Sequence, residues 1–257
     1  RFVILELASL SSITSGAMTF ILMPWIAIAL THQAASAGLM VTITSIPGLL
    51  LAPVIGSVID KIGRRKSAFW SETLTAIVNL TIVAMATFWT MNLPLLIAVS
   101  VVRSIVGWGG GSARKALIPD VAHAGGLSLE RSNSIHESIF AAGFALGPAL
   151  GALSIQWFGP YPSFAVVAGF EIASAIFTLL LKVHEHHEPV DEGDSGNFAK
   201  FAAQGFKILF ETPSVLIVMV TFLSLAIIYL PTEMVVLPTY YNGKDDPAGL
   251  GVLISCM

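Results

Sequence analysis

Charged residues are scarce in this sequence of 257 residues: Asp, Glu, Lys and Arg together make up 11%. Because a soluble globular domain carries about 25% charged residues, this composition excludes an ordinary soluble protein. The 13 basic residues are outnumbered by 16 acidic residues, whereas a nucleic-acid-binding protein would present a strongly basic surface. Cys256 is the only cysteine in the sequence, so no disulfide can form within the chain.

Hydrophobic residues, in contrast, make up 55% of the sequence and occur in long runs. A helix needs about 20 mostly apolar residues to cross a bilayer, and a crossing segment must satisfy its own backbone hydrogen bonds. The runs that reach this length are residues 2–30, 37–59, 67–90, 94–113, 135–158, 162–183 and 213–240, and a further run begins near Ala248. We therefore predict an all-α integral membrane protein that lies in a lipid bilayer.

The distribution of basic residues predicts how these spans are oriented. Lys and Arg follow the second, fourth and sixth runs, whereas the loops at 31–36, 91–93 and 159–161 contain neither. Since cytoplasmic loops are enriched in Lys and Arg, we predict a multi-pass protein of the plasma membrane with a cytoplasmic N-terminus. Two basic residues depart from the alternation: Lys244 lies in a predicted outer loop and Arg103 lies within the fourth span.

Two short segments recur near the end of the sequence. Residues 21–24 (Ile-Leu-Met-Pro) resemble residues 228–231 (Ile-Tyr-Leu-Pro), and residues 37–41 resemble residues 248–252. Two helix bundles that repeat each other in parallel are typical of many secondary transporters. For what looks like a piece of a longer protein, we predict a six-helix bundle at 1–183, an acidic cytoplasmic linker at 184–212 and the incomplete start of a second bundle at 213–257.

One group of residues in the linker could bind a metal ion. It comprises His184, Glu185, His186 and His187, and imidazole is a common metal ligand. Adjacent residues in a flexible loop offer no fixed coordination geometry, so we expect neither a metal site nor a cofactor.

The connection between the second and third spans carries a recognisable motif. Residues 56–66 read Gly-Ser-Val-Ile-Asp-Lys-Ile-Gly-Arg-Arg-Lys, which resembles the signature loop of the major facilitator superfamily. The resemblance implies a cytoplasmic gate that contacts helices of the second bundle, formed here by Gly56, Asp60, Lys61, Gly63, Arg64 and Arg65. The glycines suit that role, because Gly56 would permit close approach of helices and Gly63 a tight turn.

Two further motifs strengthen the resemblance. Residues 103–111 (Arg-Ser-Ile-Val-Gly-Trp-Gly-Gly-Gly) are similar to the superfamily motif with an intramembrane arginine, although Val106 stands where the family often has Gln. The fifth span contains Gly143, Gly147, Pro148 and Gly151, which resemble the motif of drug:proton antiporters and imply export. Ala152 replaces the final glycine of that motif.

The connection before this span resembles the macrolide-efflux and siderophore-export branches of the superfamily, in residues 113–120 and 129–134.

Arg103 would lie near the middle of the bilayer, where an unpartnered guanidinium costs several kcal/mol. Glu171 in the sixth span lies at a similar depth and is its expected partner. Such a pair fits a proton-linked step and a structural ion pair equally well. The candidates for proton coupling are Arg103, Glu171, Glu6 and Glu233, although Glu6, like Glu72, lies near the cytoplasmic boundary, where a solvated side chain is the simpler interpretation.

Together these features predict a monomeric secondary active transporter of the major facilitator type, which exchanges protons for a small, partly apolar molecule in multidrug efflux. Its central cavity would be lined by polar and aromatic side chains, with Ser12, Thr14, Met18, Trp25, Trp108 and Phe144 as candidates. A uniporter or importer on the same fold remains an alternative. A polytopic enzyme or receptor is a less favoured one, because the sequence has no cluster of catalytic side chains and no ATP-binding loop.

Overall fold

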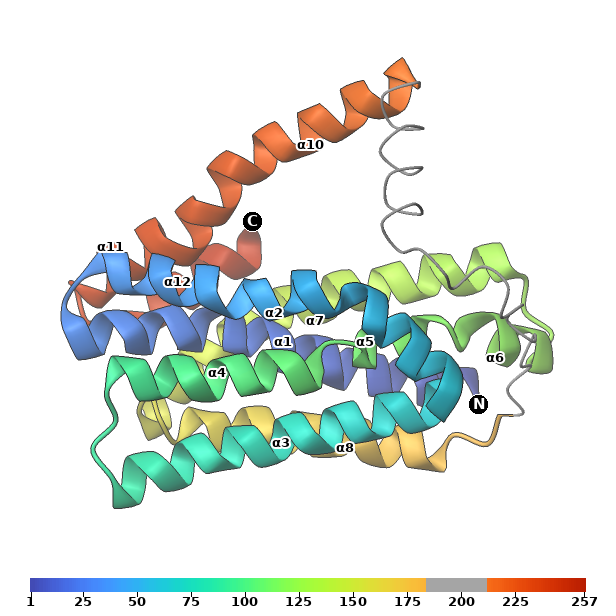
Figure 1. The fold of residues 1–257 in the computed structure, drawn as a ribbon, viewed down its shortest axis with the longest axis horizontal. Coiled ribbons are helices and arrows are strands. Elements are labelled where there is room, and N and C mark those ends of the chain that lie inside the picture. The colour runs from blue at the N-terminus through green and yellow to red at the C-terminus, as the bar shows by residue number, and fades with distance from the viewer. Residues whose placement is uncertain (184–211) are drawn as a thin grey trace.

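The computed structural model describes residues 1–183 and 212–257, and every regular element in these two ranges is helical (Figure 1). The predicted all-α fold is therefore confirmed. Six stretches of the described chain are long and apolar enough to cross a membrane. The principal helices of the first bundle are α1 (Phe2–Thr31), α2 (Ala34–Ile62), α3 (Arg64–Phe88), α4 (Leu93–Gly107), α7 (Leu129–Phe158) and α8 (Ser163–Leu180). The predicted linker falls almost wholly outside the described residues, as do its histidines.

Local sequence signals set the ends of these helices. Gly63 has φ 96° and joins α2 to α3 in one residue, a conformation that side chains disfavour. The Asn92 side chain accepts a hydrogen bond from the Leu95 backbone N–H at 3.0 Å and caps α4. Ser128 caps α7 in the same way, at 3.3 Å from the Arg131 nitrogen, and serine is a preferred residue at this position.

The helices of the first bundle lie side by side, and α1 is the central one (Figure 1). It packs against α7 and α8, while α3 packs against α8 and α2 against α4. The apolar core is built around Met18, Ile21, Leu22 and Ile26 of α1, with Phe164 of α8. Large apolar side chains such as Leu50 and Phe88 lie on the outside, where a bilayer would solvate them.

The loops divide between the two ends of the bundle as the charge pattern predicts. One end, here called the cation-rich end, holds the N-terminus, the turn at Gly63, the start of α7 and the end of α8 (Figure 1). The loops that contain neither Lys nor Arg lie at the opposite end. The structure thus places Arg64 and Lys182 on the same side, although they are far apart in the sequence.

The fourth span is broken, which its predicted continuous run over 94–113 did not anticipate. Helix α4 ends at Gly107, a short helix α5 (Gly110–Lys115) follows, and α6 (Ile118–Ala124) leads towards α7. Four glycines between 107 and 111 explain the break, because glycine is a poor helix former and tolerates irregular backbone. The break redirects α5, and this decides where Arg114 lies.

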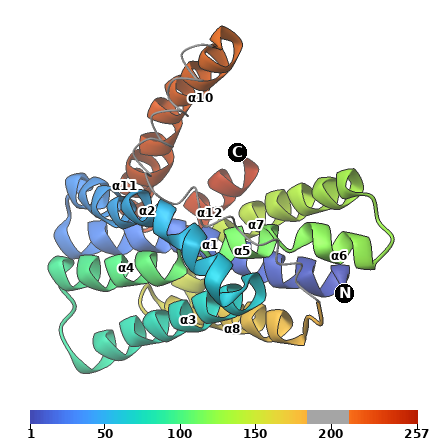
Figure 2. The same ribbon diagram turned by 45° about the vertical axis from the view of Figure 1, so that its right-hand side comes forward.

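The start of the predicted second bundle is also irregular. Helix α10 (Pro213–Pro231) projects away from the first bundle and has no buried residue (Figures 1 and 2). A π-helical turn, η2 (Thr232–Val236), leads to α11 (Leu237–Asn242) and α12 (Pro247–Cys256), which pack against α1 and α7 respectively. The irregular turn follows Pro231, which cannot donate a backbone hydrogen bond within the helix.

The glycines of the fifth span let α7 pack closely against α1. A Cβ atom added at Gly147 would lie 2.9 Å from the Thr14 carbonyl oxygen, and one added at Gly151 would lie 3.3 Å from the Met18 Cα. Both glycines are buried, as is Pro148. These positions therefore bring the backbones of α7 and α1 into close contact.

Gly147→Ala is expected to destabilise the protein by about 1–3 kcal/mol, because the added methyl group overpacks the α1–α7 contact. Gly169→Ala in α8 is the matched control, since a Cβ atom there would meet nothing within 4 Å. Equilibrium unfolding of the full-length protein in mixed micelles measures both. Equal stability of the two variants would contradict the packing role of Gly147.

Candidate functional site

A cavity of about 820 Å³ opens on the inner faces of α1, α2, α3 and α4. Glu171 of α8 reaches its wall, and residues 230, 231, 234 and 235 of the second segment border it. Its lining combines apolar side chains with small polar ones, among them Ser12, Ser15, Thr19, Thr44, Ser71, Thr75, Ser100 and Ser104. Such a lining suits a small molecule with both apolar and polar parts.

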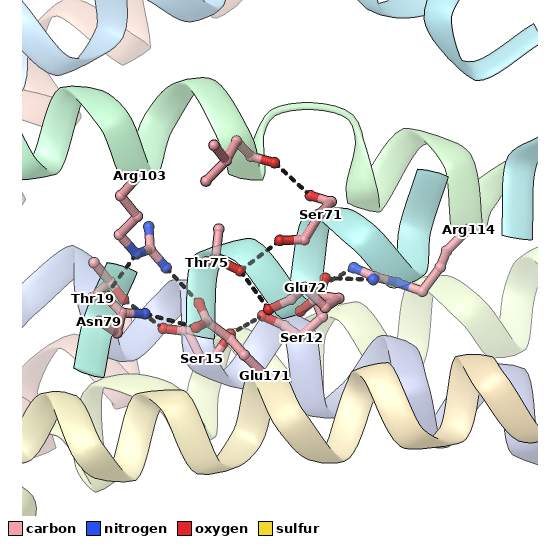
Figure 3. A network of polar contacts seen from close by, with 11 residues as sticks. Ser12, Ser15, Thr19, Ser71, Glu72, Thr75, Asn79, Arg103, Arg114 and Glu171 are labelled. Carbon is pink, nitrogen blue, oxygen red and sulfur yellow. Dashed lines mark hydrogen bonds and ion pairs between the residues drawn. The ribbon is translucent and has the colours of Figure 1, made fainter. Parts of the chain in front are cut away.

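An ion pair lies on the wall of this cavity. The Arg103 guanidinium donates a hydrogen bond to one Glu171 carboxylate oxygen at 3.0 Å (Figure 3). Glu171 is 2% exposed and the Arg103 side chain 18% exposed. The expectation that Arg103 has Glu171 as its partner is confirmed.

Asn79 of α3 completes a closed triangle with this pair, a role that nothing in the sequence indicates. Its amide nitrogen donates to Glu171 at 2.7 Å, and its amide oxygen accepts from the Arg103 Nε at 3.1 Å. Since a carboxylate only accepts and a guanidinium only donates, the amide fits in a single orientation. Asn79 is fully buried, so the triangle holds both charged groups in one geometry.

A second buried ion pair lies on the same face of α3, two turns nearer the cation-rich end. Arg114 of α5 donates to a Glu72 carboxylate oxygen and to the Ser12 hydroxyl, which itself donates to Glu72 at 2.8 Å (Figure 3). Arg114 is 3% exposed and Glu72 5% exposed. The interpretation of Glu72 as a solvated residue is therefore wrong, and Arg114 is not a free loop cation.

The glycine-rich break explains why Arg114 is buried. A Cβ atom at Gly110 would lie 2.7 Å from the Ser71 hydroxyl and 3.3 Å from a Glu72 carboxylate oxygen. Only glycine therefore lets α5 approach α3 this closely. The glycine run was visible in the sequence, but a continuous helix would have carried Arg114 away from Glu72.

Glu6 and Glu233, the other two candidates for proton coupling, do not join the Arg103–Glu171 pair. Glu6 lies 3.1 Å from the Nδ1 atom of His136 of α7, and both residues are buried near the cation-rich end. The solvated interpretation of Glu6 is wrong for the same reason as that of Glu72: another helix covers it. Glu233 is 2% exposed in η2 and is not among the residues that line the cavity.

Of the aromatic and polar residues proposed for the cavity, Trp108 and Ser12 line it. Trp25 is 3% exposed and lies in the apolar core. Thr14 and Met18 are also buried away from the lining, because helical spacing places them on the same face of α1 as Trp25. The face that borders the cavity carries small and hydroxyl residues at helical spacing, namely Ser12, Ser15, Gly16 and Thr19, a pattern that the sequence could have shown.

Phe144 of α7 is not part of the cavity lining either. Its ring lies edge-to-face with Phe20 of α1 at a centroid distance of 6.0 Å, and it stacks on Phe140 at 5.8 Å. Phe20 does border the cavity. Phe144 therefore supports a lining residue and does not contact the cavity itself.

The arginines of the signature loop bind within the first bundle. Arg64 donates to the Ala116 carbonyl at 3.0 Å and lies 3.4 Å from Asp120. Arg65 donates to the Thr178 and Leu179 carbonyls at 3.1 and 2.6 Å. These contacts fasten the turn between α2 and α3 to the ends of α5 and α8.

The remaining predicted gate residues of the signature loop are Gly56, Asp60, Lys61 and Gly63. Gly63 forms the tight turn, as predicted, and Lys61 is exposed. A Cβ atom at Gly56 would meet nothing within 4 Å among the described residues, so its role in close approach to helices of the second bundle stays a prediction. Asp60 belongs to α2, but its side chain lies outside the described atoms.

Comparison with known proteins agrees with this geometry. A family model described as Major Facilitator Superfamily matches residues 5–257. The multidrug efflux pump Tap of Mycolicibacterium fortuitum is 23% identical over 253 residues, which are 96% of this chain and 62% of the relative. The pumps of the same name in Mycobacterium bovis (strain BCG / Pasteur 1173P2) and Mycobacterium tuberculosis (strain ATCC 25618 / H37Rv) are 24% identical over 251 residues, 95% of this chain and 59% of each relative. The chain thus spans about three fifths of the length of these relatives.

Proposed function

Since the chain belongs to the major facilitator superfamily, we propose that the protein is a secondary active transporter that expels a small, partly apolar molecule in exchange for protons. In such a transporter two bundles move about a central site and expose it alternately to the two sides of the membrane. The observation that carries the proposal is the Arg103–Glu171 pair on the cavity wall. The relatives named multidrug efflux pump support export of more than one compound.

Glu171 is the proposed proton carrier. Its burial opposes the charged form of the carboxyl group, whereas the neighbouring guanidinium favours it. Because these two effects oppose each other, a change in the position of Arg103 or in access to water shifts the balance between the two forms. Protonation of Glu171 would leave Arg103 without its counter-charge. Binding of a proton would therefore change the net charge of the cavity wall.

The two buried arginine–glutamate pairs leave the wall of the cavity without net charge. Two carboxylates, Glu72 and Glu171, are each compensated by one arginine. Small hydroxyl side chains around them bond mostly to backbone carbonyls of their own helices, as Ser15 and Thr75 do at 2.8 and 2.9 Å. The cavity therefore offers a neutral wall with polar points of contact, which suits a partly apolar substrate.

We place the cation-rich end in the cytoplasm, by the positive-inside rule, with the protein in the plasma membrane. At that end the loop of Gly56, Asp60, Lys61, Gly63, Arg64 and Arg65 is the proposed gate. Its arginines attach it to α5 and α8, so the loop would move as one unit with the first bundle. The antiporter motif of α7 supports movement of the two bundles relative to each other. Helix α7 contacts α1 on one face and α12, in the segment after the linker, on another. The contact with α12 is close, because a Cβ atom at Gly251 would lie 2.8 Å from the Pro148 carbonyl oxygen.

The proposal is tested by flux measurements on the full-length protein in proteoliposomes, with a fluorescent lipophilic dye as substrate. With an acidic lumen, outward proton movement is expected to drive dye accumulation, and nigericin is expected to abolish it by collapsing the pH gradient. Dye equilibration at the same rate with and without the gradient would indicate a uniporter. Absence of any flux above that of protein-free vesicles would contradict transport of this substrate class.

A further inference from the structure

A second hollow lies on the outside of the first bundle, between α3 and α8. It has a volume of about 230 Å³ and lies on a different face of α3 from Glu72 and Asn79. Its lining is formed by Phe69, Thr73, Ala76, Ile77, Leu80, Ile172, Ala175, Ile176 and Leu179. The single hydroxyl among these residues, that of Thr73, donates to the Phe69 carbonyl at 2.8 Å. The groove therefore presents no unsatisfied side-chain polar group to an occupant.

The shape of this groove suits an extended hydrocarbon chain. Ala76 and Ala175, 3% and 6% exposed, form its floor, while Ile77, Ile176 and Leu179 at its sides are about half exposed. From Phe69 to Leu80 it follows α3 for about 16 Å at the helical rise per residue. This length is close to half of the roughly 30 Å hydrocarbon core, which is the depth of one leaflet. A chain lying there would gain dispersion contacts from two helices at once.

Positive charge is concentrated at one end of the groove. Lys66 lies one turn before Phe69, and Lys182 follows the end of α8. Both side chains are exposed, and neither forms an ion pair within residues 1–183 or 212–257. Trp70, 55% exposed and edge-to-face with Phe69 at 5.5 Å, lies at the same level, where an aromatic ring suits the headgroup region.

We propose that this groove binds one acyl chain of an anionic phospholipid whose headgroup contacts Lys66 and Lys182. Basic residues between transmembrane helices are typical contacts for anionic headgroups. The occupant is an anionic lipid and not a neutral one, because only an anionic headgroup complements the two lysines. The site is separate from the cavity, and the proposal does not depend on transport activity.

The test uses the full-length protein in detergent micelles, titrated with dioleoylphosphatidylglycerol or dioleoylphosphatidylcholine and examined by native mass spectrometry. One phosphatidylglycerol is expected to be retained more tightly than phosphatidylcholine. A Lys66→Gln/Lys182→Gln variant is expected to bind it about 25-fold more weakly, since each basic residue near an anionic lipid contributes about a factor of five. Arg131→Gln is the matched control, because Arg131 is an exposed cation of the same end on α7, away from the groove.

Thr73→Phe adds a second test, because the larger side chain fills the groove and should displace the acyl chain while leaving both lysines in place. Equal affinity for phosphatidylglycerol in the wild type, the lysine variant and the Arg131→Gln control would overturn the proposal. A lipid-independent dimer that Thr73→Phe dissociates would also overturn it, by showing that a second copy of the protein occupies the groove. The lysine variant decides the question even if Thr73→Phe does not fold.

Discussion

Replacing Glu171 with Gln is expected to reduce proton-driven transport to the level of protein-free vesicles while substrate exchange continues. Gln has nearly the same shape and can still accept a hydrogen bond from Arg103, but it cannot carry a proton through the cycle. Exchange of labelled for unlabelled substrate requires only binding and the movement of the bundles. It should therefore persist in the variant and should no longer depend on pH.

Glu137→Gln is the matched control for this experiment. Glu137 is an exposed acid of α7 that pairs with Lys115 at 2.7 Å, outside the cavity. Its replacement is expected to leave both gradient-driven transport and exchange unchanged. Undiminished gradient-driven transport in Glu171→Gln would remove Glu171 from the coupling mechanism and leave the Arg103–Glu171 pair as a structural ion pair.

Arg114→Ala is expected to destabilise the protein by about 3–5 kcal/mol, because removing one partner leaves the Glu72 carboxylate buried and unpaired. Arg114 and Glu72 are both almost fully buried, and Arg114 also donates to Ser12. Adding Glu72→Gln to the Arg114→Ala variant should recover much of the loss, since it removes the uncompensated charge. Equilibrium unfolding in mixed micelles gives the free energies of all three proteins.

The next residue in the chain provides the control. Lys115 also pairs with an acid, Glu137, but the two side chains are 61% and 58% exposed. Exposed pairs contribute little because water already solvates both charges, so Lys115→Ala should have a small effect. If Arg114→Ala were no more damaging than Lys115→Ala, the buried ion pair on α3 would be contradicted.

The features that depend on the lipid environment can be predicted from the sequence. Apolar runs of about 20 residues have few alternatives to membrane-spanning helices, and an arginine in such a run requires a partner. Arg103 and Glu171 could therefore be paired by depth alone. The spacing of Gly147 and Gly151 also indicates a helix face suited to close packing, because residues four apart share a helix face.

Two kinds of feature could not be predicted in this way: those that depend on a break within a helix, and those in which a third helix adds a side chain to a pair formed by two others. Arg114 is buried because the chain leaves helical geometry after Gly107, and charge counting alone assigns such a residue to a loop. Asn79 joins the ion pair although nothing in its neighbourhood distinguishes it from a packing residue. Aromatic character alone would place Trp25 in the cavity, whereas the face of α1 that borders the cavity carries Ser12, Ser15 and Thr19.

Proton movement driven by substrate tests the central proposal most directly. Full-length wild-type protein is reconstituted with the pH indicator pyranine in the lumen, without an imposed pH gradient, and substrate is added outside. Exchange of protons for substrate predicts that the lumen becomes alkaline as substrate enters, and that this change is absent with Glu171→Gln. Substrate entry into wild-type vesicles without any change in luminal pH would contradict proton-coupled transport through this cavity.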